Sequence, residues 1–320
     1  MGLNDTRAPG GGATGPFAPD LSVRIGKLVM ANPVGLASGT AGFGAEYREL
    51  AALDRLGALY TKAVTPEPRA GNPAPRLAET PSGLLNSIGL ANPGLEAFVR
   101  DRLPKVRALG RAVVVNVAGA AVDDYVRVVE GIEAAGGVDA YELNVSCPNV
   151  KSGGMAFGTD PALVALVTET VRRATERPLV VKLSPNVTDI RETARAAEAS
   201  GADAVSAINT LVGMAIDVKA RKPRLAMKTG GLSGPAVKPV GVAAVYRISR
   251  AVRIPVIGLG GISTADDALE YLLAGADAVQ VGTATFADPR AALRVLEGIE
   301  AWMRANGVSR VADIKTLLSD

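Results

Sequence analysis

Residues 254–283, IPVIGLGGISTADDALEYLLAGADAVQVGT, contain the unit from which most of the chain is built. An apolar run at 254–261 is followed by a helix-like segment at 264–276 and a second apolar run at 276–283. Short runs without polar alternation are typical of parallel strands that are buried on both faces. Gly275 suits the left-handed cap that ends a helix before the next strand. The stretch therefore predicts a strand–helix–strand unit.

The same unit recurs along the chain, with similar glycine phrases in AAGGVDAY and ASGADAV. We expect strands at residues 33–38, 58–64, 112–119, 140–146, 178–184, 202–209, 254–261 and 276–283. Eight such units predict an α/β fold, a (β/α)8 TIM barrel. A doubly wound sheet is the alternative, but the strand count and even spacing favour the barrel. Residues 65–111 and 210–253 are long insertions after strands 2 and 6, so we expect one barrel domain over 21–320 behind a flexible arm at 1–20.

The composition removes several mechanisms before any motif is considered. Hydrophobic residues make up 48% of the 320 residues and charged residues 21%, which is typical of globular chains. The chain has no histidine and one cysteine, Cys147, so a Ser–His–Asp triad, a Cys–His dyad, an internal disulfide and a His- or Cys-ligated metal site are excluded within it. The single thiol fits a reducing compartment, and we expect a cytoplasmic protein. The net charge of +3 and the absence of a long apolar run predict neither a nucleic-acid nor a membrane partner.

Polar residues gather where the predicted strands end. They are Ser38, Lys62, Asn116, Asn144, Lys182, Asn209 and Thr210. The carboxyl ends of barrel strands meet at one mouth, where barrel enzymes keep their chemistry. Buried lysines and amides are costly unless they are paired. Together these side chains predict a polar ligand that carries anionic and amide-like groups.

The last two predicted strands end in glycine-rich loops, GLGGIST and VGTATF. Glycine lets backbone N–H groups approach an anion, and a following helix N-terminus adds partial positive charge. Loops after strands 7 and 8 are the common phosphate position in this architecture. With Lys182 across the mouth, flavin mononucleotide (FMN) fits better than pyridoxal phosphate, although a Schiff-base lysine is not excluded by the residues alone.

Cys147 follows the fourth predicted strand and begins a glycine-rich loop, CPNVKSGGMAFGTDP. A free cysteine is most often a small buried hydrophobe. Here it lies beyond the strand, between Asn144 and Asn149, where a thiolate is a suitable proton acceptor near neutral pH. We interpret Cys147 as a general base on a loop that closes over the site.

With these residues assembled, the sequence resembles the dihydroorotate dehydrogenases, and among them the class 1B catalytic subunit. The resemblance runs from about residue 20 to about residue 300 and includes TKAVTPEPRAGNPAPRLAETPSGLLNSIGLANPG, ELNVSCPNVKSGGMAFGTDP, VVKLSPNVTDI, INTLVGMAID and GGLSGPAVKPV. It implies that FMN contacts Ser38, Lys62, Ala63, Asn116, Asn144, Lys182, Ile208, Gly234, Gly260, Gly261, Gly282 and Thr283. It implies that dihydroorotate is held by Lys62, Asn86, Ser87, Ile88, Gly89, Leu90, Asn144, Asn209 and Thr210.

The resemblance also implies a reaction and a partner. (S)-Dihydroorotate would be oxidised to orotate in pyrimidine biosynthesis, with the hydride passing to FMN and a proton to Cys147. Class 1B enzymes pass electrons to NAD⁺ through a second subunit that carries FAD and a [2Fe–2S] cluster, around a homodimer core of a heterotetramer. Three alternatives stay open: a class 1A-like homodimer that uses fumarate, a non-redox isomerase or synthase acting on a phosphorylated metabolite, and a catalytically inactive binding subunit.

Overall fold

A closed parallel barrel forms the centre of the molecule. The computed structural model describes residues 18–47, 52–145 and 157–319. The barrel strands are β3 (Val34–Leu36), β4 (Ala58–Tyr60), β7 (Ala112–Val117), β8 (Ala140–Asn144), β9 (Leu179–Lys182), β10 (Ala204–Ala207), β15 (Val256–Leu259) and β16 (Ala278–Val281). They pair in chain order, and β16 closes the ring against β3. Each strand lies inside the range expected from the sequence, so the (β/α)8 barrel is confirmed.

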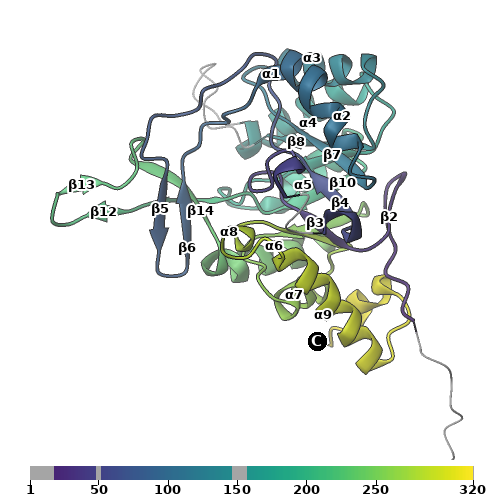
Figure 1. The fold of residues 1–320 in the computed structure, drawn as a ribbon. Helices are drawn as coiled ribbons and strands as arrows, with labels where there is room; N and C mark the ends of the chain where they lie inside the picture. The colour runs from purple at the N-terminus through teal and green to yellow at the C-terminus, as the bar shows by residue number, and fades with distance from the viewer. Residues whose placement is uncertain (1–17, 48–51, 146–156, 320) are drawn as a thin grey trace, which may run out of the picture.

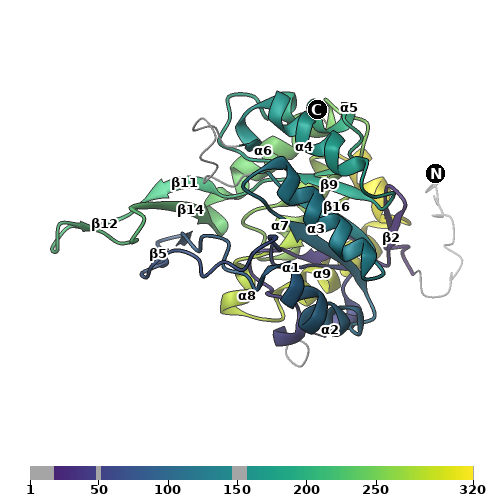
Figure 2. The same ribbon diagram turned by 90° about the horizontal axis from the view of Figure 1, so that it is seen from above.

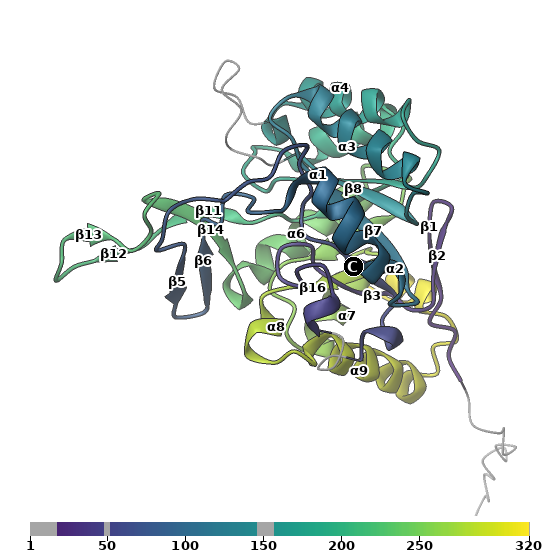
Figure 3. The same ribbon diagram turned by 45° about the horizontal axis from the view of Figure 1, so that its top comes forward.

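Helices surround the barrel, with α3 and α4 on one flank and α7 and α9 on the other (Figure 3). The longer helices are α3 (Val122–Ala134), α4 (Pro161–Arg172), α5 (Ile190–Ala199), α6 (Lys238–Ser249), α7 (Ala265–Leu273) and α9 (Ala291–Asn306); the shorter ones are α1 (Gly94–Ala97), α2 (Leu103–Arg107) and α8 (Ala284–Ala287). Thr264 and Asp267 cap the start of α7 reciprocally, because each side chain accepts a hydrogen bond from the backbone N–H of the other. Gly275 follows α7 and has a positive φ of +115°, in agreement with the glycine cap that the sequence predicted at the end of this helix.

Strand β8 shows how the barrel separates its two faces. Successive side chains of a strand point to opposite faces. Tyr141 points outward and donates a hydrogen bond to Glu133 on α3, with 3.0 Å between the oxygens. Glu142 points inward and is fully buried, in contact with side chains from other barrel strands. The same strand thus packs a helix on one side and carries a charge into the barrel on the other.

The two predicted insertions join in one sheet. The first contains β5 (Leu77–Thr80) and β6 (Gly83–Asn86), and the second contains β11 (Leu211–Met214) and β14 (Thr229–Ser233). These strands pair antiparallel in the order β11-β14-β6-β5, with a small hairpin of β12 (Ile216–Asp217) and β13 (Lys222–Pro223) beyond them. The sheet projects away from the barrel in Figures 1 and 2. The sequence predicted both insertions but not their pairing.

A hairpin of β1 (Val23–Ile25) and β2 (Leu28–Met30) lies on the side of the barrel opposite to the insertion sheet (Figure 2). Just before it, the N–H of Asp20 donates a 2.8 Å hydrogen bond to the carbonyl of Ser309, which ties this segment to the C-terminal region. The predicted flexible arm falls almost entirely on residues 1–17, outside the described residues, and stays a prediction. Within the described ranges, no helix is both long and apolar enough to cross a membrane.

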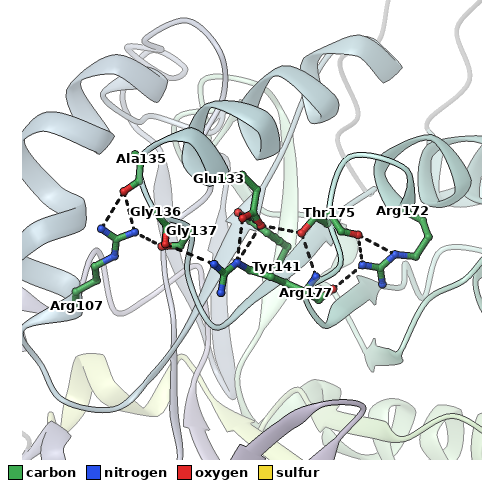
Figure 4. Close-up of polar contacts among 9 residues, drawn as sticks. All are labelled: Arg107, Glu133, Ala135, Gly136, Gly137, Tyr141, Arg172, Thr175 and Arg177. Atoms are coloured by element: carbon green, nitrogen blue, oxygen red, sulfur yellow. Dashed lines mark hydrogen bonds and ion pairs between the residues drawn. The ribbon is translucent and has the colours of Figure 1, made fainter.

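Outside the barrel wall, near the amino-terminal ends of β8 and β9, lies a hydrogen-bonded group that we call the Glu133 network (Figure 4). It consists of Glu133, Tyr141, Thr175 and Arg177. One carboxylate oxygen, Oε1 of Glu133, accepts from Tyr141 at 3.0 Å, Thr175 at 2.7 Å and Nε of Arg177 at 3.0 Å. Burial raises the pKa of Glu133, but these donors outweigh it and leave the pKa below its ordinary 4.5. The network ties the end of α3 and the start of β8 to the loop that precedes β9.

Candidate active site

A buried acidic group inside the barrel organises the mouth, and we call it the Glu142 cluster: Glu142, Asn116, Lys182, Ser206 and Gln280. Oε2 of Glu142 accepts from the amide nitrogen of Asn116 at 2.7 Å. Oε1 accepts from the hydroxyl of Ser206 at 2.9 Å and the amide nitrogen of Gln280 at 3.0 Å. Nζ of Lys182 lies 4.0 Å from Oε2, and the two side chains are 8% and 0% exposed. The carboxylate is therefore satisfied from four different strands.

Lys182 links this cluster to the first barrel strand. Its ammonium donates a 3.3 Å hydrogen bond to the hydroxyl of Ser38, which follows β3. Both residues were predicted from the sequence as cofactor contacts, and the structure brings them together from strands far apart in the chain. A lysine held between a hydroxyl and a carboxylate presents fixed positive charge to a ligand at the mouth.

Three glycine-containing turns meet beside the mouth. A Cβ at Gly261 would lie 2.8 Å from the carbonyl oxygen of Gly234, so the turns that hold these residues pack backbone to backbone. The hydroxyl of Thr283 donates to that of Ser233 at 2.8 Å, which brings in the turn after β16. Gly234, Gly260 and Gly261 all have positive φ, at +94°, +123° and +73°. Because glycines lack a Cβ, the backbone N–H groups of these turns can come close to an anion, and we call them a glycine cradle suitable for a phosphate.

The helix that follows the last of these turns is a single turn long. Helix α8 contains only Ala284–Ala287, and the dipole of a single turn is small because it is the sum of few aligned peptides. Anion binding there would depend on the N–H groups of the turns. The remaining predicted cofactor contacts, Ala63 and Ile208, are buried at 6% and 3% exposure, and Gly282 packs against Ala37.

Two predicted substrate residues form a pair of amides. The side-chain nitrogen of Asn209 donates to the side-chain oxygen of Asn144 at 3.2 Å. The oxygen of Asn209 accepts from the backbone N–H of Thr210 at 2.9 Å. The hydroxyl of Tyr125 on α3 donates to the backbone carbonyl of Asn144 at 3.0 Å. This chain of hydrogen bonds fixes both amide orientations at the ends of β8 and β10.

The predicted substrate residues of the first insertion reach the same region through the shared sheet. Asn86 donates to the carbonyl of Gly231 at 3.2 Å, and Gly231 packs so closely on Thr210 that a Cβ there would overlap it. Asn72 holds the next residues in place. Its side-chain nitrogen donates to the backbone carbonyl of Ser87 at 3.0 Å, and its backbone N–H donates to the backbone carbonyl of Ile88 at 3.0 Å. Gly89 and Leu90 follow with φ +73° and +56°.

Lys62 follows β4 and lies beside the first insertion. Burial lowers the pKa of its amine, the charge of Arg76 lowers it further, and Glu46 partly opposes them. A lysine of this kind gains from an anionic ligand, because a carboxylate would offset both the burial and the repulsion by Arg76.

Cys147 and residues 146–156 of its loop lie outside the described residues, so the role of Cys147 stays a prediction. Among the described residues, no group of three or more His, Cys, Asp or Glu side chains is arranged to hold a metal ion.

Comparison with known proteins decides the family. A sequence model described as dihydroorotate dehydrogenase matches residues 20–303. The chain belongs to the dihydroorotate dehydrogenase family. The resemblance predicted from the sequence motifs is confirmed at this level.

Three curated relatives carry the name dihydroorotate dehydrogenase B (NAD(+)), catalytic subunit. The protein of Trichlorobacter lovleyi is 52% identical over 300 residues, which cover 94% of this chain and 98% of the relative. That of Alkaliphilus oremlandii is 52% identical over 295 residues, covering 92% and 97%. That of Bacteroides fragilis is 51% identical over 295 residues, with the same coverage.

The residues at the mouth of this dihydroorotate dehydrogenase family member fit the flavin that the sequence predicts. The side-chain oxygen of Asn116 is buried and has no hydrogen-bond partner among the described residues, as expected for an acceptor reserved for a ligand. The glycine cradle suits a phosphate, and Lys182 supplies positive charge at the mouth. These features agree with FMN, while the individual contacts stay predictions.

Sequence reasoning missed three members of the Glu142 cluster: Glu142, Ser206 and Gln280. Each is a polar residue in the middle of a mostly apolar predicted strand, in AYELNVS, ADAVSAIN and ADAVQVGT. That placement was the available signal, because a polar side chain in the middle of a buried strand requires a partner. What the sequence cannot show is that the three side chains meet across the barrel.

Proposed function

We propose that this chain is the catalytic subunit of an NAD⁺-linked dihydroorotate dehydrogenase that uses FMN and oxidises (S)-dihydroorotate to orotate in pyrimidine biosynthesis. One observation carries the proposal. The mouth combines a buried acceptor on Asn116, an ammonium on Lys182 and a glycine cradle, which suits a phosphorylated flavin. The names of the relatives and the family membership support the substrate.

The residues of the chain divide the work of binding. Lys62 would hold the substrate carboxylate, since an anion relieves the cost of burying its amine. Asn144 and Asn209, whose orientations are fixed by their mutual hydrogen bond, would pair with the C=O and N–H groups of the pyrimidine ring. Such complementary amides discriminate strongly, because a wrong ligand leaves buried polar groups without partners.

The oxidation removes a hydride from C6 and a proton from C5. FMN supplies the hydride acceptor when it is bound. We assign the C5 proton to the thiolate of Cys147. A closed loop over the site would exclude water, and Lys182 would keep positive charge at the ring edge that becomes more negative.

The electron acceptor belongs to the same proposal. The word subunit in the relatives' names supports a partner chain, and we propose a homodimer core in a heterotetramer with subunits that carry FAD and [2Fe–2S]. The sole thiol of this chain excludes such a cluster within it. A cytoplasmic location stays a prediction from the sequence.

An activity assay tests the proposal. Purified protein is reconstituted with FMN and given dihydroorotate, alone and with the partner subunit, with NAD⁺ or fumarate as acceptor. We expect orotate formation, with NAD⁺ used only when the partner is present. Rapid use of fumarate by the chain alone would instead favour a class 1A-like enzyme. A preparation that binds no flavin would overturn the proposal, and turnover of a phosphorylated sugar would support the non-redox alternative.

The variant Cys147→Ala tests the assigned base. We expect the flavin to stay bound and the rate of flavin reduction by dihydroorotate to fall about 10²–10⁴-fold, the range typical of general base catalysis. Stopped-flow absorbance measures that rate directly. Reduction at the wild-type rate would show that the proton goes to another group.

A further inference from the structure

The Glu142 cluster contains a buried carboxylate that the proposed reaction does not use. Among the described residues, every polar neighbour that contacts its oxygens is a donor: two amide nitrogens, one hydroxyl and one ammonium. Such a set suits an ionised carboxylate, because a protonated one would place its O–H against a donor at every contact except Ser206, whose hydroxyl can also accept. An ion with no exposed surface persists only when it is paired and hydrogen-bonded, as here.

The carboxylate determines which way the amide of Asn116 faces. Its nitrogen is held by Glu142 at 2.7 Å, so its oxygen is the atom left without a partner. If Glu142 were an amide, only one of its two terminal atoms could accept, so a donor would face either Asn116 or the pair of Ser206 and Gln280, and the orientation of Asn116 would no longer be imposed. A ligand at the mouth would then no longer meet an acceptor that is held in one orientation.

The same carboxylate sets the charge beside Lys182. Nζ of Lys182 lies 4.0 Å from Glu142 Oε2 and 3.3 Å from the hydroxyl of Ser38, which carries no charge. Glu142 is therefore the anion that balances this buried ammonium. Without it, a ligand would meet an uncompensated positive charge.

We propose that Glu142 is a positioning residue for the flavin: it fixes the acceptor face of Asn116 and balances Lys182, although it does not contact the ligand itself. The proposal rests on the proposed function, since it assumes that FMN binds at the mouth. It adds a residue that acts through two others.

The test compares the FMN dissociation constants of the wild-type apoprotein, Glu142→Gln and Glu142→Asp, measured by the quenching of flavin fluorescence. We expect Glu142→Gln to weaken FMN binding at least about tenfold, since a lost hydrogen bond at a buried site has an effect of that order. Glu142→Asp keeps the charge but is one methylene shorter, so it should weaken binding by a smaller factor. It also serves as the second variant if Glu142→Gln yields too little folded protein.

The matched control is Glu133→Gln, the same substitution at the other end of the barrel. It removes a hydrogen-bonded carboxylate from the Glu133 network and should lower thermal stability while leaving the FMN dissociation constant within about threefold of wild type. If both glutamine variants weakened FMN binding equally, the effect of Glu142 would be general destabilisation and the proposal would fail.

A second measurement separates positioning from packing. At saturating FMN, the flavin midpoint potential of Glu142→Gln should move to more positive values than in wild type. The reason is that removing a nearby negative charge favours the more negative reduced flavin. An unchanged or more negative potential, or unchanged FMN binding in both Glu142 variants, overturns the inference. A wild-type protein that binds no FMN would instead overturn the proposed function.

Discussion

One hydrogen-bonded glutamate, Glu133, lies outside the barrel near its amino-terminal end, and another, Glu142, lies inside the barrel below the mouth. The carboxylate of Glu133, whose side chain is 27% exposed, accepts hydrogen bonds from Tyr141, Thr175 and Arg177. The Glu142 cluster is buried but leaves the acceptor oxygen of Asn116 without a partner among the described residues. A network complete in itself contributes to stability, whereas one that leaves groups open is prepared for a ligand.

The largest expected effect comes from removing the ammonium of the Glu142 cluster. Lys182→Met leaves the carboxylate buried without its counter-charge, and breaking a buried pair in this way costs about 3–5 kcal/mol. The apoprotein should unfold at lower urea concentration and should no longer retain flavin. The double variant Lys182→Met/Glu142→Gln should recover part of the stability, because no lone charge is left. Additive losses in the double variant would show that the two residues are not coupled.

At the amino-terminal end, Glu133→Gln should lower the free energy of unfolding by about 1–3 kcal/mol, since it leaves donors poorly satisfied, without changing turnover. The loss should depend on pH. The pKa of Glu133 is lowered in the folded state, so its contribution is present above about pH 4.5 and disappears as the pH falls through the lowered value. Urea unfolding curves of wild type and variant should therefore converge in acid. A Glu133→Gln variant with normal stability but reduced turnover would contradict the assignment of Glu133 to stability and of the Glu142 cluster to ligand binding.

Lys62 provides a pH-dependent test of the mouth. Burial and the charge of Arg76 lower the pKa of its amine below 10.5, so the ammonium is lost as the pH rises through that lowered value. If Lys62 binds the substrate carboxylate, KM for dihydroorotate should rise, by up to about tenfold per pH unit beyond that point. Steady-state kinetics between pH 7 and pH 10 measure the rise. Lys62→Arg should remove it, because a guanidinium stays charged; a KM that is independent of pH in wild type would argue against this role.

The smallest effect is expected on the outer surface of α9. Arg304 pairs with Glu300 one helical turn away, at 2.5 Å, with 50% and 28% of the two side chains exposed. Pairs of this kind contribute about 0.2–0.5 kcal/mol in isolated helices. Arg304→Ala should therefore change the urea midpoint only slightly and should leave flavin binding unchanged. A loss as large as that of Glu133→Gln would mean that exposure is a poor guide to the importance of charges here.

The sequence predicted the barrel because its strands are short, apolar and evenly spaced, and each is found within its expected range. It placed Ser38, Lys182, Asn144 and Asn209 at strand ends, and the structure brings them together in pairs. It did not predict the joint sheet of the insertions, since antiparallel pairing between segments about 145 residues apart leaves no local pattern. Nor did it predict the Glu142 cluster, whose members contact one another only after the barrel closes.

The pairing of β6 with β14 has a consequence for any redesign of this scaffold. Deleting either insertion would remove the strand that pairs with the other insertion. The exposed strand edge could then pair with another chain and promote aggregation. Asn86 and Thr210 are also carried on this one platform, on either side of Gly231. A change of substrate specificity in this protein therefore requires that both insertions be replaced together.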